Sequence, residues 1–425
     1  MELSPEDLVA IERTLLLLGP LFVAGVLVLL YRPTARQATA AMVTFLWQLP
    51  VLLLVHLIAA HLGFWSFAAP DNHLAGHPID VWIGWAVWWG PVAFFLRRWL
   101  SIPVVILLFV ALDFVSMPLL RPLVVLDPAW FIGELPAVLI ALVPGLVFAR
   151  LTETDRLPRL RASFHCFGWG GYMLLVIPLV ALSAEGRNPA DLLVMPQSLA
   201  GWLLMAGVAL LLFIGIAATA EFAIVGSGTP IPLDPPKRVV TTGPYAFLAN
   251  PMQTICAMLM LLLAIYFASW GLALVSLSFL VFDLVYAAWY NRVHIARAMS
   301  EEWNSYQANI PYWRPQWRPY IDGETQLTIS PSGPMRIAWD VVWPRLSKQL
   351  VAPIEIREHA EDAVPGRLLY ERKKAGVSDT GIIALARLLE HGPAPLATIG
   401  LLIRFPLLGS ALQLASGLVI RVFRL

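Results

Sequence analysis

The stretch EFAIVGSGTPIPLDPPKRVVTTGPYAFLANPMQT, residues 221–254, places a polar loop rich in proline and glycine directly before an apolar segment. Proline and glycine interrupt regular structure and favour turns, so a loop of this kind ends one helix and begins another. Apolar segments of helix length lie on both sides of it, at Leu199–Phe222 and Met252–Ala268. The stretch therefore predicts a loop at a membrane surface between two membrane helices.

The composition of the whole chain places it among membrane proteins. Hydrophobic residues make up 59% of the 425 residues and charged residues 13%, against roughly 45–50% and 25% in soluble domains. The net charge of +1 gives no strong field for nucleic acid, which excludes nucleic acid as a partner. The two cysteines, Cys166 and Cys256, lie beside or within apolar segments. This arrangement argues against a disulfide framework, a cysteine zinc site and a dithiol redox centre.

A membrane-spanning helix needs about 20 predominantly apolar residues, and nine segments have this character. They are Thr14–Tyr31, Ala41–Ala60, Ile79–Leu96, Ile102–Leu120, Trp130–Ala149, Phe167–Ser183, Leu199–Phe222, Met252–Ala268 and Trp270–Trp289. A further apolar run at Ala397–Ile420 is broken by Arg404 and Pro406, so we interpret it as amphipathic helices on a domain or bilayer surface. The sequence thus predicts an all-α polytopic membrane protein with about nine transmembrane helices.

The orientation follows from the lysines and arginines in the short loops. Loops after the odd-numbered segments carry ten of them, whereas the opposite side, with the N-terminus, carries three. Basic loops remain in the cytoplasm, so we expect the N-terminus outside and the C-terminus in the cytoplasm. The expected localisation is an inner bacterial membrane.

Three regions follow from the pattern along the chain. Residues 1–187 form a six-helix transmembrane module of unknown role, and residues 188–320 form a second membrane core with a helical hairpin that turns at Phe267–Trp270. Residues 321–425 are more polar. Of the 29 lysines and arginines, 16 lie at or beyond Arg292, so a water-exposed domain is predicted at this end.

The turn Gly243-Pro244-Tyr245, the following Asn250-Pro251 and the segment EEWNSYQANIPYWRP at 301–315 closely resemble the isoprenylcysteine carboxyl methyltransferase family of membrane enzymes, which includes phospholipid N-methyltransferase relatives. The resemblance covers about residues 198–320. It implies binding of S-adenosylmethionine and methyl transfer to a lipidic or isoprenoid-type acceptor. The cofactor-binding residues that it implies are Gly243, Pro244, Tyr245, Asn250, Pro251, Glu301, Glu302 and Tyr306.

The chain departs from the family pattern at several charged or polar positions. The family's arginine before Asn-Pro is Ala249 here, its later tyrosine is Gln253, and its paired glutamates are replaced by Asn291 and Arg292. A reversed charge at a desolvated contact is worth several kcal/mol. Glu301 and Glu302 could compensate from two turns farther along. The departures leave an alternative, in which the core is preserved for packing after catalysis has lapsed.

Residues Gln326–Leu425 look like the thiol-disulfide oxidoreductase family named for its Asp-Cys-Cys signature, whose domain is thioredoxin-like. Gly333 and Arg336 stand where the cysteines of that family would be. Thiolate chemistry needs the thiols, so the resemblance implies a small α/β domain that binds or braces. Within it, residues 366–391 predict a strand, a turn and a helix capped by Ser378 or Asp379. We also expect a cis peptide bond at Pro365.

Ionisable residues near the spans of the first region are functional candidates because their burial is costly. Asp113 is the best of them, since it lies in the middle of a segment, whereas Asp80 and Glu134 fall near outer ends where water would hydrate them. His56 and His61 lack a third ligand at metal spacing, so no metal site is expected. The neighbouring tryptophans suit an interfacial belt or, alternatively, line a lipid or pigment pocket; they are Trp82, Trp85, Trp88, Trp89 and Trp130.

Two functions from different classes fit these observations. The first is an S-adenosylmethionine-dependent membrane methyltransferase whose lipidic acceptor enters from the bilayer. The second is a non-catalytic membrane protein, such as a scaffold or accessory subunit of a larger complex, that reuses two lapsed enzyme folds as interaction surfaces. Membrane lipids and membrane-protein partners are the expected partners.

Overall fold

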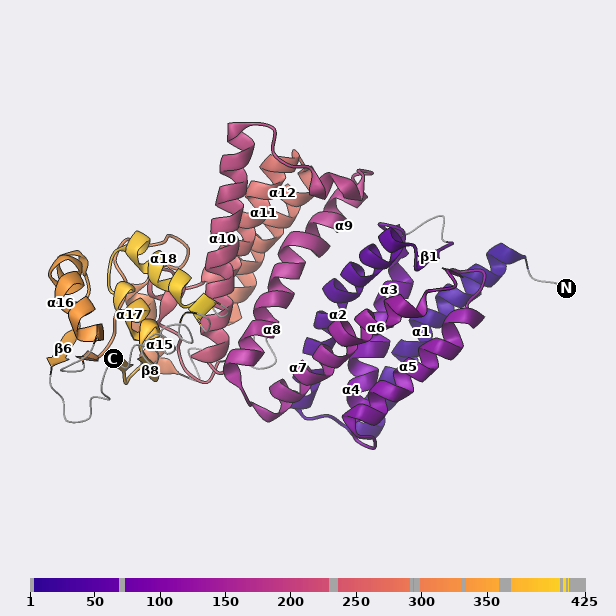
Figure 1. Ribbon diagram of the computed structural model, residues 1–425, viewed down its shortest axis with the longest axis horizontal. Coiled ribbons are helices and arrows are strands. Elements are labelled where there is room, and N and C mark those ends of the chain that lie inside the picture. The colour runs from indigo at the N-terminus through magenta and orange to yellow at the C-terminus, as the bar shows by residue number, and fades with distance from the viewer. Residues whose placement is uncertain are drawn as a thin grey trace. The chain divides into compact units, whose positions relative to one another are not determined.

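The structure is a computed structural model that describes residues 4–68, 73–228, 236–290, 293, 299–329, 334–358, 368–405, 408–409 and 412 (Figure 1). The chain divides into two compact units. The first contains Met1–Pro196 with Ile231–Pro235 and Phe267–Leu272, and the second contains Gln197–Pro230, Pro236–Tyr266 and Ala273–Leu425.

The first unit is a helical bundle with short strands in its loops (Figure 1). Its helical segments are α1 Pro5–Tyr31, α2 Ala35–Leu62, α3 Ile79–Val87, η1 Trp88–Val92, α4 Ala93–Leu96, α5 Ile102–Leu119, α6 Phe131–Ala137, η2 Val138–Leu142, α7 Val143–Thr154, α8 Pro158–Gly171, η3 Tyr172–Val176, α9 Ile177–Ala184 and η4 Pro189–Leu193. Its strands are β1 Trp65–Phe67, β2 His73–Leu74, β3 His77–Pro78 and β4 Val124–Leu126.

The second unit joins membrane-type helices to a small α/β domain. Its helical segments are α10 Leu199–Ile224, η5 Gly243–Ala246, α11 Pro251–Phe267, α12 Trp270–Val281, η6 Phe282–Ala287, α13 Ala288–Tyr290, α15 Ser300–Asn309, α16 Pro334–Leu346, η8 Ser347–Gln349, α17 Ile382–Leu389 and α18 Ala394–Ile403. Its strands are β5 Thr325–Ile329, β6 Glu355–Glu358, β7 Leu368–Arg372 and β8 Val377–Thr380.

Among the described residues, eight helices are long and apolar enough to cross a membrane. They are Pro5–Tyr31, Ala35–Leu62, Ile79–Leu96, Ile102–Leu119, Phe131–Thr154, Pro158–Ala184, Leu199–Ile224 and Trp270–Tyr290. Large apolar side chains such as Phe22 and Leu29 on α1 and Leu119 on α5 are about three-quarters exposed in the isolated chain, as expected of helices whose outer face meets lipid. The chain is therefore an all-α multi-pass membrane protein with a few strands in its C-terminal domain.

Eight of the nine predicted spans correspond to these helices. The exception is Met252–Ala268, which is the 17-residue helix α11 and falls below the length of the other eight. At 1.5 Å per residue α11 is about 26 Å long, near the lower limit for a span. It pairs antiparallel with α12, because Ser276 Oγ donates to Ala257 O at 2.7 Å and Asn250 contacts Asp283 at the other end.

Three spans of the first unit contain a π-helical turn, and each turn is close to a proline. Pro91 lies within η1, while Pro144 and Pro178 follow η2 and η3 by two residues. Proline has no N–H to continue the regular ladder, so the helix widens locally. Another π-helical segment, η6, has no proline but contains the buried Asp283.

Loops that the sequence assigns to the same side of the membrane lie together in the first unit. Strands β1 and β4, which follow the second and fourth spans, pair antiparallel. At the basic loops, Arg36 pairs with Asp155 at 3.1 Å and Arg97 with Glu153 at 3.2 Å. The grouping of these loops is as predicted from the lysines and arginines, and which group faces the cytoplasm stays a prediction.

The α/β domain contains a four-stranded sheet in the order β6-β5-β7-β8. Strands β5 and β6 are parallel, whereas β5 with β7 and β7 with β8 are antiparallel. The predicted cap of the following helix is wrong, because Ser378 and Asp379 belong to β8 and the residue before α17 is Gly381, without a side-chain cap. Asp379 instead accepts a hydrogen bond from Arg387, at 3.0 Å.

Candidate functional site

The predicted cofactor turn is a buried 3-10 turn beside the C-terminal end of α10. Every residue from Val239 to Pro251 is buried. Gly243 has φ +61, which favours glycine, and a Cβ there would lie 3.2 Å from Cγ of Glu221. The Gly-Pro-Tyr sequence thus permits the chain to turn directly against a buried carboxylate.

Backbone carbonyls of this turn accept hydrogen bonds from α15 and from the segment that follows it. Tyr306 donates its hydroxyl to Tyr245 O at 2.8 Å, and Gln316 Nε2 donates to Ala246 O at 3.2 Å. The backbone N–H of Tyr320 also donates to Ala246 O, at 2.7 Å. Burial raises the pKa of both Tyr245 and Tyr306, so both phenols are neutral at physiological pH. These contacts make the turn and residues 306–320 one packed layer.

Glu221 of α10 is bound by two arginines of the α/β domain. Arg387 Nη1 lies 2.6 Å from Glu221 Oε1 and Arg404 Nη1 lies 3.0 Å from Oε2. Arg387 also pairs with Asp379, and Arg404 with Glu390. Burial alone would lower the pKa of Arg387, but the attraction of these acids outweighs it and holds the pKa well above its usual value. The cluster remains charged and ties the domain to α10.

A second polar group lies where α11 begins. Asn250 Nδ2 donates to Oδ1 of Asp283 in η6, and Thr254 Oγ1 donates to Oδ2 at 3.3 Å. Asp283 is 1% exposed, and among the described residues no Lys, Arg or His forms an ion pair with it. This group therefore places an acid with neutral hydrogen-bond donors at the predicted cofactor end of the hairpin.

Two buried polar atoms near this group have unused hydrogen-bonding capacity. Gln253 Oε1 and Trp303 Nε1 have no hydrogen-bond partner among the residues that the structure describes. Trp303 packs in one apolar cluster with Ala249, which directly precedes Asn250. The buried Tyr245 hydroxyl likewise has no partner within the described ranges. Buried polar groups are normally paired, so these atoms indicate where a polar ligand could bind.

The predicted site residues divide into two groups in the structure. Gly243, Pro244, Tyr245, Asn250, Pro251 and Tyr306 are all buried in the layer around the turn. Glu301 and Glu302 are exposed on α15, whereas Trp303 and Tyr306 of the same helix are buried. The two glutamates thus lie on the solvent face of α15.

Some predictions fall on residues outside the described part of the chain. Arg292, which stands where the family has a glutamate, is one of them, as are Gly333 and Pro365. Arg336 lies in α16, but its side chain is not described.

Local sequence patterns did not predict the acids and arginines that form the buried polar contacts of this unit. Glu221 was quoted only as the start of a loop, and Asp283 was counted within an apolar span. An isolated acid within a 20-residue apolar segment was the available signal for both. Nothing in the local sequence connects Glu221 with Arg387, 166 residues later.

Comparison with known proteins leaves the chain's family open: no protein-family model, no curated protein and no solved structure matches it.

Proposed function

We propose that the second unit is a membrane methyltransferase-like core that binds S-adenosylmethionine beside the start of α11. The observation that carries the proposal is the Asn250–Asp283 contact, with Gln253 Oε1 and Trp303 Nε1 buried and unpaired nearby among the described residues. These residues belong to the same elements that the family resemblance assigns to the cofactor.

The donor set fits such a cofactor chemically. S-adenosylmethionine carries a positive sulfonium and a charged amino-acid end, and it supplies the methyl group when bound. A buried carboxylate such as Asp283 favours a cation, because desolvation strengthens their attraction. Gln253 Oε1 can accept from an ammonium or amino group, and Trp303 Nε1 can donate to a carboxylate or adenine nitrogen. Asp283 would thus replace the paired glutamates that the chain lacks.

In this proposal the α/β domain acts as a brace for the turn that lies beside the cofactor. Arg387 and Arg404 hold Glu221 behind the turn, and Arg372 Nη2 donates to Thr241 Oγ1 at 3.2 Å. The sheet order β6-β5-β7-β8, with one parallel and two antiparallel pairs, agrees with a thioredoxin-like arrangement. We propose that this domain lacks thiol chemistry and positions the turn.

The membrane setting is part of the proposal. With α11 as a ninth span, an N-terminus outside places the turn and α15 in the cytoplasm of a bacterial cell, where S-adenosylmethionine is available. A lipidic or isoprenoid-type acceptor would approach from the bilayer beside α11 and α12, whose outer side chains Met258, Leu261 and Leu277 are about half exposed.

Isothermal titration of S-adenosylmethionine into the full-length protein in detergent tests this proposal. We expect saturable binding that Asp283→Asn weakens by about tenfold or more, because a hydrogen-bonded charge contributes about 1.5–3 kcal/mol. Trp303→Phe removes the indole N–H and should weaken binding less. Glu355→Gln is the control, since it neutralises an exposed acid of the same unit outside the predicted site and should leave the affinity unchanged. No binding at millimolar cofactor would overturn the proposal.

The second candidate is a non-catalytic membrane scaffold, and the Glu221 cluster favours it. An ion cluster that packs the α/β domain onto the turn would be kept for assembly alone if catalysis had lapsed. This function predicts the absence of cofactor binding together with a strong loss of stability when the cluster is broken.

A further inference from the structure

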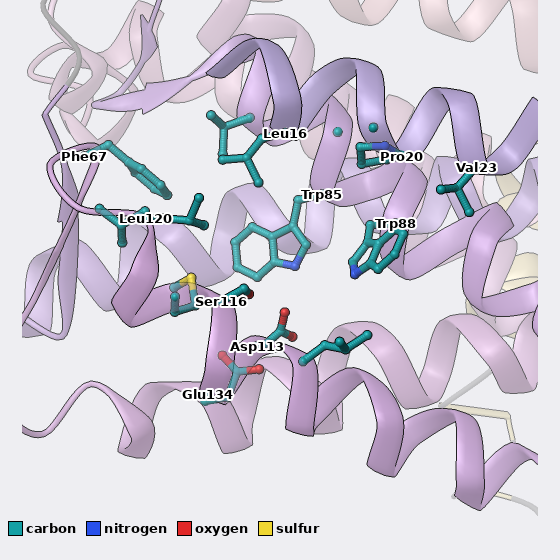
Figure 2. A pocket seen from close by; sticks show the side chains of 16 residues that line it. Leu16, Pro20, Val23, Phe67, Trp85, Trp88, Asp113, Ser116, Leu120 and Glu134 are labelled. Carbon is teal, nitrogen blue, oxygen red and sulfur yellow. The ribbon is translucent and has the colours of Figure 1, made fainter. Parts of the chain in front are cut away.

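A cavity in the first unit contains two carboxyl groups and two indoles. Its volume is about 340 Å³, and it lies among α1, α3, η1, α5 and α6. Figure 2 shows Asp113, Glu134, Trp85 and Trp88 directed toward the same space. Almost all other lining side chains are apolar. The cavity belongs entirely to the first unit and is separate from the elements of the proposed cofactor site.

The cavity exists because two helices cross at close range. A Cβ on Gly84 of α3 would lie 1.8 Å from the carbonyl oxygen of Leu16 on α1, so only glycine permits this crossing. α1 thereby forms one wall, with Leu16, Gly19, Pro20 and Val23. The other face of α1 exposes apolar side chains such as Phe22. A ligand from the bilayer would therefore reach the cavity along a lipid-facing helix.

The carboxyl pair corrects two expectations from the sequence. Asp113 lies in a cavity as a functional acid would, but Glu134, expected to be hydrated, is 2% exposed. The interfacial belt is also wrong for Trp82 and Trp89, which are buried in the core, while Trp85 and Trp88 line the cavity.

The hydrogen bonds of the pair leave acceptor capacity in the cavity. Trp89 Nε1 donates to Asp113 Oδ2 at 3.1 Å. Glu134 Oε1 is buried and has no hydrogen-bond partner among the described residues. None of the lining residues, all of which the structure describes, is Lys, Arg or His. Two carboxyl groups in one apolar space resist ionising together, so at most one of them is expected to carry a negative charge.

We propose that this cavity binds a monocationic amphiphile, with its positive head against the two neighbouring carboxyl groups and its apolar body against α1 and α5. One negative charge without a cation of the chain calls for a single positive charge from a ligand. The indoles of Trp85 and Trp88 add a favourable surface for an ammonium group. The apolar walls exclude a small hydrated metal ion and suit an alkyl chain or ring system.

Calorimetry with the full-length protein in zwitterionic lipid nanodiscs tests the proposal, with empty nanodiscs subtracted. The probes are octyltrimethylammonium, octanol and octyl sulfate, which share a chain and differ in charge. We expect saturable 1:1 binding of the cation, at least about tenfold tighter than octanol, and no binding of the sulfate. Equal affinities for the cation and octanol, or preference for the sulfate, would overturn the proposal.

The variant Asp113→Asn/Glu134→Gln keeps the shape of both side chains and removes the charge. It should weaken cation binding by about 10- to 100-fold and leave octanol binding in place, which reports an intact cavity. Asp127→Asn, at an acid outside the cavity, should bind the cation like the wild type. Trp88→Leu should weaken cation binding several-fold, whereas Trp99→Leu, at an exposed indole, should not.

If the double variant also loses octanol, Glu134→Gln alone decides the question. It leaves the Asp113–Trp89 hydrogen bond in place and must still weaken cation binding by about tenfold. Wild-type cation affinity in the double variant or in Glu134→Gln would show that the carboxyls do not hold the head group, and the proposal would fail.

Discussion

The Glu221 cluster of the second unit and the Asp113–Glu134 pair of the first unit bury carboxyl groups in opposite ways. In the second unit, Glu221 meets the side chains of Arg387 and Arg404, so the chain itself supplies its cations. In the first unit, Asp113 and Glu134 face a cavity whose described lining residues include no cation. A buried acid that the chain neutralises contributes to the fold, whereas a buried pair without a cation costs folding free energy that a ligand can offset. The difference separates an acid that holds the structure together from a pair that can serve binding.

Breaking the Glu221 cluster should have the largest effect on stability. Thr242 donates its hydroxyl to Glu221 Oε1, and Glu221→Gln keeps the size and an oxygen for this bond. The variant leaves Arg387 and Arg404 buried beside a neutral group. Removing one partner of a buried ion pair typically costs about 3–5 kcal/mol, and we expect a loss of this size in the free energy of unfolding. Denaturant titration of the full-length protein in detergent, followed by circular dichroism, measures it.

The matched control for this variant is Glu355→Gln, which removes one partner of an exposed ion pair with Arg357. Exposed pairs contribute little, so no measurable change is expected there. If Glu221→Gln unfolds at the same denaturant concentration as the wild type, the cluster does not brace the turn and the contrast between the two units fails.

A buried histidine of the α/β domain should make stability depend on pH. Burial and the nearby charge of Arg372 lower the pKa of His391 to about 4, below the usual 6.5. The unfolded chain therefore takes up the proton first as the pH falls, so stability is complete above about pH 6.5 and declines toward pH 4. The full decline is about 3 kcal/mol, from a difference of about 2.5 pKa units.

Substitution of His391 isolates this contribution. The Nδ1 of His391 lies 3.1 Å from Pro353 O, and His391→Asn retains a donor for that carbonyl but does not titrate. The slope of unfolding free energy against pH between 4 and 6.5 should become shallower in the variant, while both proteins show parallel curves between pH 7 and 8. An unchanged slope below pH 6.5 would mean that His391 is not kept neutral by the fold.

The smallest effect on stability should come from the cavity acids. In Asp113→Asn/Glu134→Gln, the charge that the fold leaves without a cation is removed while the shape is retained. Replacement of buried charges by neutral groups is often neutral or stabilising, so the melting temperature should stay unchanged or rise. A loss as large as that of Glu221→Gln would show that the carboxyls are structural, and would remove the distinction between the two units.

The local sequence predicted the helices of this chain well because their signal is short-range. A run of about 20 apolar residues must form its hydrogen bonds within itself in a bilayer, so length and composition suffice. Eight of the nine predicted segments are helices of spanning length, and the arginine-bearing loops lie together as their charges indicated. The helix α11 shows the limit of this argument, since 17 residues sit at the threshold.

The partners of the buried acids were decided by the tertiary structure. Glu221 and Arg404 are 183 residues apart, and Asp113 and Glu134 lie in different spans, so no local pattern pairs them. Glu134 looked hydrated because its position along the helix is near an end, but in the folded bundle it is buried and lines the cavity. The sequence by itself determined that the chain enters a membrane and where its helices run. Which acids are neutralised by the chain and which face a cavity depends on packing between distant segments, because burial and charge are properties of the folded environment.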